Sequence, residues 1–351
     1  MALAALADAA DAAAALRVSR KGPLVLLFYD GFDQHAIDRP GGALRSWAHA
    51  TSRYAYRRAR GAQLYTGFYV AFRAYVAGLE AIGCDVRIND FALARSMPDY
   101  PIGVGGFPSA VDAVAALPNP KIWGPGDCGP HERFSDLIAR HNFKLFTQPS
   151  PWAKEALQPF AQGRMRDCFA GIDMVRWPDW STEPKTNDVL IYDKLYWDRD
   201  QHIQSVLTPL ISHLDQSGLS HQVIRYSKYS YAEFRRSLQR SRVFVFLSRH
   251  ESQGLACNEA MAANLPVFAW DEGVLADPNM PPLPADANVT SVPYFDSRCG
   301  MRFKLDEMLP AFDAFWSTRE RFKPRTFVEQ KLALPHSGRR YLSLYASLCT
   351  S

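Results

Sequence analysis

Two glutamates in one short stretch have the spacing and surroundings of ligand-binding residues. Glu251 follows the apolar run "VFVFL" at 243–247, and Glu259 comes eight positions later, with Gly254 between them. The run is typical of a buried strand, and "LACNEAMAANL" after it is typical of a helix. Glu251 is therefore expected in a loop, where it can accept hydrogen bonds from sugar hydroxyls. Glu259 is expected inside the helix, where it can accept a bidentate pair from vicinal hydroxyls such as those of a ribose.

The start of that helix offers a second kind of ligand group. The backbone N–H groups of Gly254 and Leu255 lie where a helix begins, and such groups bind anions. A sugar diphosphate is one anion that fits. The simpler interpretation is that Glu251 caps the helix and Glu259 is a solvated surface residue.

The rest of the chain predicts the elements that would hold these residues. Its 351 residues suit two domains. A buried strand at 23–31, a helix at 67–83 closed by Gly83 and a strand at 84–90 indicate a first α/β domain, and the same alternation restarts at 188–194. Two Rossmann-like domains of this kind would leave a cleft at the carboxyl ends of both sheets. The predicted segments are an alanine-rich start at 1–22, a first domain at 23–170 with an insertion at about 30–66, a linker at 171–187, a second domain at 188–326 and a terminal helix within 327–351.

The stretch around the glutamates resembles the E-x7-E signature of retaining glycosyltransferases with the GT-B fold, especially those like family 4. The pattern S-x-x-E-x-x-G-L-x-x-x-E-A-M-A-x-x-x-P-V is matched by Ser248, Glu251, Gly254, Leu255, Glu259, Ala260, Met261, Ala262, Pro266 and Val267. "GIDMVRWPD" (171–179) looks like the family's "G-V-D-x-x-x-F-x-P". "SPWAKEAL" (150–157) looks like the helix start that precedes it. "RRYLSLYASL" (339–348) looks like the terminal helix that crosses back to the first domain. The resemblance covers most of residues 23–350 and is weak in 30–66 and 275–325.

This resemblance implies further site residues. In the family a basic pair near the first strand of the second domain holds the donor diphosphate, and here Lys194 and Arg199 stand in that place, in reversed order. The family also places glycines after its first strand, where the backbone approaches the donor phosphate. Gly41 and Gly42 form one candidate motif, and Gly67, at the start of a predicted helix, is the other.

Charge is distributed unevenly along the chain. The net charge is only +4, but the segment from Arg39 to Leu79 contains seven arginines, Arg57 and Arg58 among them, and no acidic residue. Aromatic residues alternate with these arginines. The segment could bind an anionic or lipid-linked acceptor, an anionic membrane surface or nucleic acid; the simplest alternative is a solvated helix.

Other polar residues give weaker signals. His131 and Asp127 follow a strand of the first domain and are candidates for positioning an acceptor. His250, beside Glu251, is expected to point outward. The histidines and six cysteines lack metal-ligand spacing, so neither a catalytic metal nor a cofactor is expected.

The sequence thus predicts a metal-independent glycosyltransferase. It would move a sugar from a nucleotide-diphosphate sugar to a glycan or lipid-linked acceptor with retention of configuration, in polysaccharide or glycolipid synthesis. Two alternatives stay open: a sugar-nucleotide epimerase or phosphorolytic enzyme of the same fold, and a non-catalytic nucleic-acid-binding protein. The start of the chain lacks the features of a signal peptide. A cytoplasmic protein is expected, in peripheral contact with the inner face of the membrane if the basic segment binds lipid.

Overall fold

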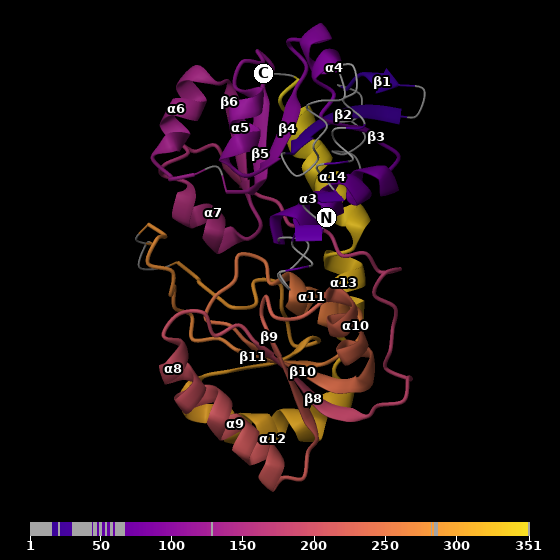
Figure 1. Ribbon diagram of the computed structural model, residues 1–351, viewed down its shortest axis with the longest axis vertical. Helices are drawn as coiled ribbons and strands as arrows, with labels where there is room; N and C mark the ends of the chain where they lie inside the picture. Colours follow the sequence, from indigo (N-terminus) through magenta and orange to yellow (C-terminus); the bar gives the residue numbers. More distant parts are fainter. Residues whose placement is uncertain are drawn as a thin grey trace. The chain divides into compact units, whose positions relative to one another are not determined.

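The computed structural model of the chain describes residues 16–19, 22–29, 44, 48, 51–52, 55–56, 59, 67–127, 129–281, 283 and 287–349. These residues form two compact units (Figure 1). Unit 1 contains the described residues as far as Gly171, together with those from Leu334 on, and unit 2 contains Ile172–Ala333. No helix among the described residues is long and apolar enough to cross a membrane.

Unit 1 is built around a mainly parallel sheet. Its parallel strands lie in the order β3-β2-β4-β5-β6-β7, and the short β1 pairs antiparallel with the start of β2. Continuous apolar runs form the central strands because both faces of the sheet are buried. The strands are β1 (Val18–Ser19), β2 (Gly22–Tyr29), β3 (Asp85–Ile88), β4 (Ile102–Gly106), β5 (Lys121–Gly126), β6 (Phe143–Gln148) and β7 (Met165–Asp167).

Two helices distant in sequence pack together in unit 1. The predicted helix after the insertion is α3 (Gly67–Ala81), which Gly83 follows with a φ of +85°. The predicted terminal helix is α14 (Leu334–Ala346), which packs on α3 and so returns the chain to the first unit. The shorter helices are α4 (Phe91–Ser96), α5 (Pro108–Val114), α6 (Arg133–Arg140) and α7 (Pro151–Leu157).

Unit 2 contains a fully parallel five-stranded sheet in the order β12-β11-β10-β8-β9. The strands predicted at 188–194 and 243–247 are present as β8 and β10, and β9, β11 and β12 complete the sheet. The prediction of two α/β units with parallel sheets and a returning terminal helix is therefore confirmed. The strands are β8 (Asn187–Asp193), β9 (His221–Arg225), β10 (Ser241–Leu247), β11 (Val267–Trp270) and β12 (Gly300–Phe303).

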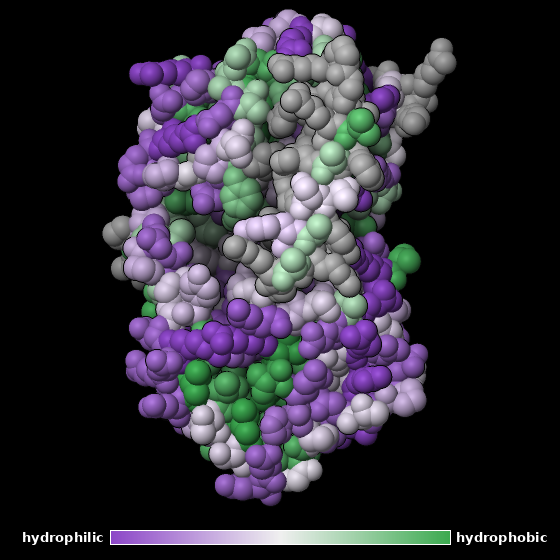
Figure 2. Space-filling model, viewed as in Figure 1, coloured by the Kyte–Doolittle hydropathy of each residue, from purple (hydrophilic) through white to green (hydrophobic). Residues whose placement is uncertain are grey.

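Helices cover this sheet. The apolar core includes Val189, Val245 and Phe268, and it extends to partly buried side chains such as Ile211. On the face drawn in Figure 2, hydrophobic residues of unit 2 form a cluster ringed by hydrophilic ones. The helical segments are α8 (Arg199–His202), η2 (Ile203–Leu207), α9 (Thr208–Gln216), α10 (Tyr231–Arg240), α11 (Leu255–Ala262), η3 (Leu305–Glu307), α12 (Met308–Thr318), η4 (Arg319–Arg321) and α13 (Pro324–Lys331).

The helical segment that follows β8 is not a regular α-helix. Its middle, Ile203–Leu207, is a π-helical turn between α8 and α9. Pro209 follows and has no N–H to donate to the carbonyl four residues earlier, which weakens the α-helical pattern there.

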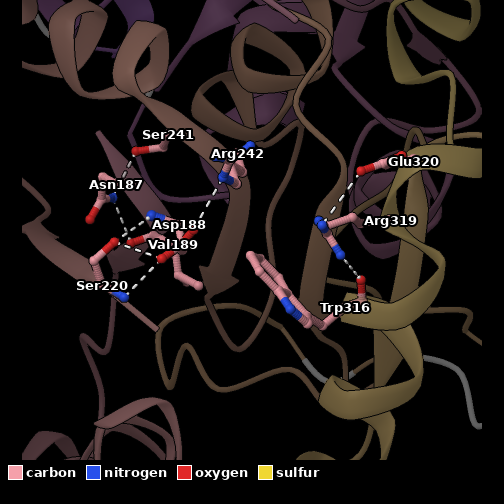
Figure 3. A network of polar contacts seen from close by, with 9 residues as sticks. All are labelled: Asn187, Asp188, Val189, Ser220, Ser241, Arg242, Trp316, Arg319 and Glu320. Atoms are coloured by element: carbon pink, nitrogen blue, oxygen red, sulfur yellow. Dashed lines mark hydrogen bonds and ion pairs between the residues drawn. The ribbon is translucent and has the colours of Figure 1, made fainter. Parts of the chain in front are cut away.

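The amino ends of the second sheet are tied together by polar contacts (Figure 3). Asp188 accepts hydrogen bonds from the Ser220 hydroxyl at 2.7 Å and from Arg242 Nε at 3.1 Å. The Asn187 amide donates to Ser241 Oγ at 2.9 Å. Because these polar side chains hydrogen-bond to one another, we expect this edge of the sheet to have a structural role.

The segment predicted as a linker is packed against unit 2. Trp177 is 2% exposed and Trp180 is 5% exposed. The backbone N–H of Trp180 donates to the carbonyl of Ala263 at 3.3 Å. Unit 2 thus begins at Ile172, before its first strand, and Ile172 forms a parallel bridge with Ala333 at its other end.

Candidate functional site

Two of the charged residues singled out by sequence, Lys194 and Glu251, lie near the carboxyl ends of neighbouring strands of the second sheet. Counted along the chain, the strands of unit 2 have the order 2-1-3-4-5, so the connections run in opposite directions from β8 and β10. In open α/β sheets, ligands bind outside the carboxyl ends of the two strands where the order switches. Lys194 directly follows β8, and Ser248 directly follows β10.

Lys194 and Glu251 form an ion pair at this position. Lys194 Nζ lies 2.6 Å from Glu251 Oε1, and the side chains are 24% and 10% exposed. The Ser248 hydroxyl also donates to Glu251 Oε1 at 2.9 Å, while Lys194 Nζ lies 4.8 Å from the centre of the Tyr226 ring. A partly buried cation next to oriented oxygen acceptors can bind a phosphate and a sugar hydroxyl side by side.

The loop that carries Glu251 ends at Gly254. Gly254 has a φ of +73° and precedes the first residue of α11. A Cβ built there would meet Ser291 O at 3.6 Å, which is ordinary contact, so the backbone conformation is what favours glycine. This left-handed residue places Gly254 and Leu255 at the helix start, as the sequence predicted, and their N–H groups belong to the first turn.

A buried aspartate, Asp271, is hydrogen-bonded to the segment that contacts this loop. Asp271, which follows β11, accepts hydrogen bonds from the Thr290 hydroxyl at 2.7 Å and the Ser291 N–H at 2.9 Å. The Thr290 carbonyl accepts in turn from the Glu251 N–H at 3.1 Å. Sequence reasoning missed this support because 275–325 shows no clear pattern.

Arg199 is not brought together with the ion pair. Its guanidinium binds both carboxylate oxygens of Asp193, at 2.9 and 2.6 Å, and donates to the Leu195 carbonyl at 3.0 Å. Asp193 is only 2% exposed, and its hydrogen bond raises the pKa of Arg199. In this arrangement Arg199 fixes the end of β8, directly before Lys194.

Glu259 lies on α11 and contacts a different set of groups. Arg176 and Trp177 are the side chains that act on its carboxylate. Burial raises the pKa of Glu259 to about 8, against the lowering effects of Arg176 and Trp177. The side chain is partly exposed. The interpretation of Glu259 as a solvated surface residue does not describe this environment.

His250 does not point outward, contrary to the expectation from sequence. It is 8% exposed, its ring stacks on Trp197 at 4.6 Å, and its Nδ1 accepts from the Ala276 N–H at 3.2 Å. Burial lowers its pKa. Trp197 and the loop at 276 cover the His250 ring. Both are distant from His250 in sequence, so the sequence could not predict this burial.

The candidates in unit 1 are spread over its loops. The His131 ring packs edge-on against Phe160, with ring centres 4.1 Å apart, and lies 3.1 Å from the Glu132 carboxylate. Asp127 is exposed and accepts from the Gly129 N–H at 2.8 Å. Gly67 is the exposed first residue of α3. Four further candidates lie outside the described residues: Gly41, Gly42, Arg57 and Arg58.

Within the part of the chain that the structure describes, no three His, Cys, Asp or Glu side chains gather in a way that could hold a metal ion. Two buried aspartates at the carboxyl ends of strands of the same sheet have partners of other kinds. Asp193 binds Arg199, and Asp271 binds Thr290.

Comparison with known proteins identifies a related sequence segment. Residues 204–278, which include Glu251 and Glu259, match the family described as glycosyl transferases group 1. Lys194 lies outside the matched segment. A comparison with curated protein sequences finds no match.

Solved structures extend the comparison to the fold. Sucrose-phosphate synthase from Thermosynechococcus elongatus superposes with a TM-score of 0.55 at 12% identity, over 93% of this chain and 98% of that one. The pneumococcal O-GlcNAc transferase GtfA, in complex with UDP and GlcNAc, gives 0.49 at 12% identity, over 74% of this chain and 60% of that one. The chain therefore spans about three fifths of the length of GtfA. Starch synthase IV from Arabidopsis thaliana, bound to ADP and acarbose, gives 0.47 at 13% identity, over 82% and 79%. Together with the two parallel sheets, the first likeness shows a GT-B fold.

Proposed function

We propose that this chain is a glycosyltransferase that takes a sugar from a nucleotide-diphosphate donor and retains its anomeric configuration. The observation that carries the proposal is the Lys194–Glu251 ion pair of 2.6 Å at the switch point of the second sheet. The match of residues 204–278 to group 1 glycosyl transferases supports it, since the matched segment contains the loop with Glu251.

In this proposal, Lys194 stabilises the charge that grows on the leaving diphosphate. The N–H groups of Gly254 and Leu255 add dipoles at the start of α11. Such preorganised groups act most strongly on the transition state, where the negative charge is largest. Glu251 would release Lys194 to the diphosphate and accept hydrogen bonds from the donor sugar.

Arg199 takes a different part from that of a second phosphate ligand. Because its guanidinium already binds Asp193 through two hydrogen bonds, we assign it to holding the turn that presents Lys194. In this assignment only Lys194, the first residue of the basic pair, needs to reach the diphosphate. The reversed order of the pair, compared with the family, is then compatible with donor binding.

Glu259 is the proposed ligand of the donor ribose. It lies a little over one turn into α11, four residues beyond Leu255, at about 1.5 Å of rise per residue. A nucleotide has the same order of parts, phosphate and then ribose. Only the ionised carboxylate can accept hydrogen bonds from both ribose hydroxyls.

For the acceptor we propose a glycan or a lipid-linked sugar bound by unit 1. The acid-free segment at 39–79 supports contact with an anionic acceptor or an anionic membrane surface. Replacement of Arg53, Arg57, Arg58 and Arg60 by Gln is expected to raise the acceptor KM or to abolish binding to anionic liposomes, with donor affinity unchanged. A cytoplasmic enzyme of polysaccharide or glycolipid synthesis, without a catalytic metal, completes the proposal.

The first experiment is a thermal-shift screen of UDP, GDP, ADP and their sugar conjugates. A ligand at about 100 times its Kd should add roughly 2.7 kcal/mol of stability. The best donor is then incubated alone and with a panel of glycan acceptors, and the anomeric protons of the product are followed by NMR. Product formed from donor alone would identify an epimerase instead, and an inverted anomer would contradict retention.

Glu259→Ala provides the matched test of donor binding. It should weaken binding of the best nucleoside diphosphate while the protein stays folded, with Glu329→Ala, on the exposed side of α13, as a control. Unchanged affinity in calorimetry would remove Glu259 from the site.

A further inference from the structure

The short helix α8 carries two side chains that contact the segments on either side of the ion pair. At its start, Arg199 binds the Asp193 carboxylate at 2.9 and 2.6 Å, directly before the lysine of the pair. At its end, His202 Nε2 lies 2.7 Å from Arg249 Nη1. Arg249 is two positions before Glu251 in the same loop. One helix therefore contacts both segments that present the ion pair.

The chemistry of the two groups determines the direction of the contact between His202 and Arg249. A guanidinium has donors and no acceptor, so Arg249 Nη1 donates and His202 Nε2 accepts. An imidazole whose Nε2 accepts is neutral and carries its proton on Nδ1. His202 Nδ1 has no hydrogen-bond partner among the described residues, so the contact at Nε2 decides the tautomer.

Trp270 of β11 packs against both groups. Its ring is 1% exposed and lies edge-on to the His202 ring, with centres 5.0 Å apart. The guanidinium carbon of Arg249 lies 5.4 Å from the centre of the same indole. The indole N–H donates to Glu272 Oε1 at 2.7 Å, which fixes the ring, and His202 is only 5% exposed. The histidine and the arginine are thus held against a fixed aromatic surface.

Charged groups reach the His202 ring from two of the elements around it. Burial and then the charge of Arg249 lower the pKa of His202, while Asp198, directly before α8, acts in the opposite direction. From β11 the ring is met by Trp270, which does not titrate. Protonation of His202 would place two cations against each other and remove the acceptor, so the neutral ring is the form that can hold Arg249.

We infer that His202 is a positioning residue for Glu251: its neutral Nε2 holds Arg249, and with it the loop from which Glu251 reaches the donor sugar. The inference rests on the proposed function, in which Glu251 accepts hydrogen bonds from that sugar. A small displacement of a group that orients a substrate weakens both binding and turnover. His202 therefore does for the loop of Glu251 what Arg199 does for the segment of Lys194.

Two substitutions separate the acceptor from simple packing. His202→Gln supplies a side-chain carbonyl that can accept from Arg249 and does not titrate, whereas His202→Phe keeps a flat ring beside Trp270 and has no acceptor. His213→Phe is the matched control. His213 lies on α9 in the same helical segment, and its Nε2 has a separate partner, the Asp313 carboxylate at 2.7 Å.

The first measurement needs no ligand. Nitrogen-15 NMR of labelled histidine rings, assigned with His202→Gln and His213→Phe, shows which ring nitrogen carries the proton. At pH 7.5 we expect His202 to be neutral with its proton on Nδ1, and His213 to carry a proton on Nε2, because that atom faces a carboxylate. A proton on Nε2 of His202 overturns the inference.

The second measurement compares the sugar nucleotide that binds the wild type best with its nucleoside diphosphate, by calorimetry at pH 7.5. His202→Phe should weaken binding of the sugar nucleotide about three- to tenfold, since hydrogen bonds to the sugar are lost, and change that of the nucleoside diphosphate less than about twofold. His202→Gln should recover most of this loss. A purely structural role would instead lower the stability of His202→Phe and weaken both ligands alike.

Three results of the calorimetry contradict the inference: wild-type affinity of His202→Phe for the sugar nucleotide, an equal loss for both ligands, and a loss that His213→Phe shares. If no sugar nucleotide binds the wild type, the proposed function itself fails, while the NMR result still decides whether His202 holds Arg249. Intact donor binding together with the wrong tautomer would reject only the role of His202.

Discussion

Both units have a switch point between two neighbouring parallel strands, and they place different residues there. In unit 2 the switch lies between β8 and β10 and carries the ion pair of Lys194 and Glu251. In unit 1 the corresponding strands are β2 and β4. Phe107 follows β4 and contacts Phe68 of α3 at 5.5 Å, and each of these rings is more than a third exposed.

The difference suggests that the two units bind different ligands. Charged groups that the fold already holds in position suit a highly charged ligand, such as a diphosphate. Exposed aromatic rings suit a ligand with a flat apolar face, such as a sugar ring, and give less orientation. We therefore expect substitutions at the switch point of unit 2 to affect turnover and those at unit 1 to affect acceptor binding.

The largest effect is expected for Lys194→Ala. Removal of the cation should lower kcat about 100-fold or more and change donor affinity less, because its charge matters most as the diphosphate leaves. Steady-state kinetics with the best donor would measure it, with Lys331→Ala, at the exposed end of α13, as a control. A variant that keeps wild-type kcat would mean that the diphosphate is held elsewhere.

Arg199→Ala should show its effect mainly in stability. It leaves the carboxylate of Asp193, which is 2% exposed, without its charged partner, and we expect a loss of roughly 2–3 kcal/mol in urea unfolding. Arg199→Lys should recover part of this loss, since one charged contact remains. Loss of kcat with full stability would instead return Arg199 to the diphosphate, beside Lys194.

The stability of unit 2 and its affinity for nucleotide should change with pH in opposite directions. The folded pKa of Glu259, about 8, lies above its usual value of 4.5, so the folded state binds more protons and stability falls as the pH rises through that interval. Nucleotide affinity should rise with pH, by up to about tenfold between pH 7 and 9, because the carboxylate is the binding form. Urea unfolding and calorimetry across this range would test both, and Glu259→Gln should remove both.

The smallest effect is expected in unit 1. Phe107→Ala should raise the acceptor KM by about three- to tenfold, since one stacked ring contributes roughly 0.5–1.5 kcal/mol, and leave donor affinity unchanged. Val175→Ala, which alters a 90% exposed side chain in unit 2, is a control for surface substitution. If Phe107→Ala weakens the donor as much as the acceptor, the proposed division between the units is wrong.

The sequence predicted the elements that have a strong local pattern. Runs such as "VFVFL" mark strands buried on both faces, and the apolar period marks α3 and α10. It did not mark β4, although β4 is central, because "IGVGG" has three glycines in five residues and a weak strand propensity. The helices α4 and α5 have six and seven residues, too few for a helical period to show.

The same limit applies to the site. Glu251 was predictable because it lies in the loop after a buried strand, and Lys194 because the family resemblance places a basic residue after the first strand of the second domain. The partner of Arg199 could not be chosen from sequence, since Asp193 and several other acidic residues lie within reach along the chain. The hydrogen bond from Arg325 to the Trp177 carbonyl joins segments 148 positions apart, and only tertiary packing determines it.

The packing of α14 on α3 has a consequence for how the protein is made. Gly78 and Gly338 let the two helices approach so closely that a Cβ at Gly338 would meet the Gly78 carbonyl at 2.1 Å. Unit 2 is continuous in sequence from Ile172 to Ala333, whereas unit 1 needs residues from both sides of it. On the ribosome, unit 2 can therefore fold as soon as it emerges, but unit 1 must wait for Leu334–Ala346, with the α3 surface uncovered until then. The time for which the α3 surface stays uncovered is thus set by the synthesis of the second unit.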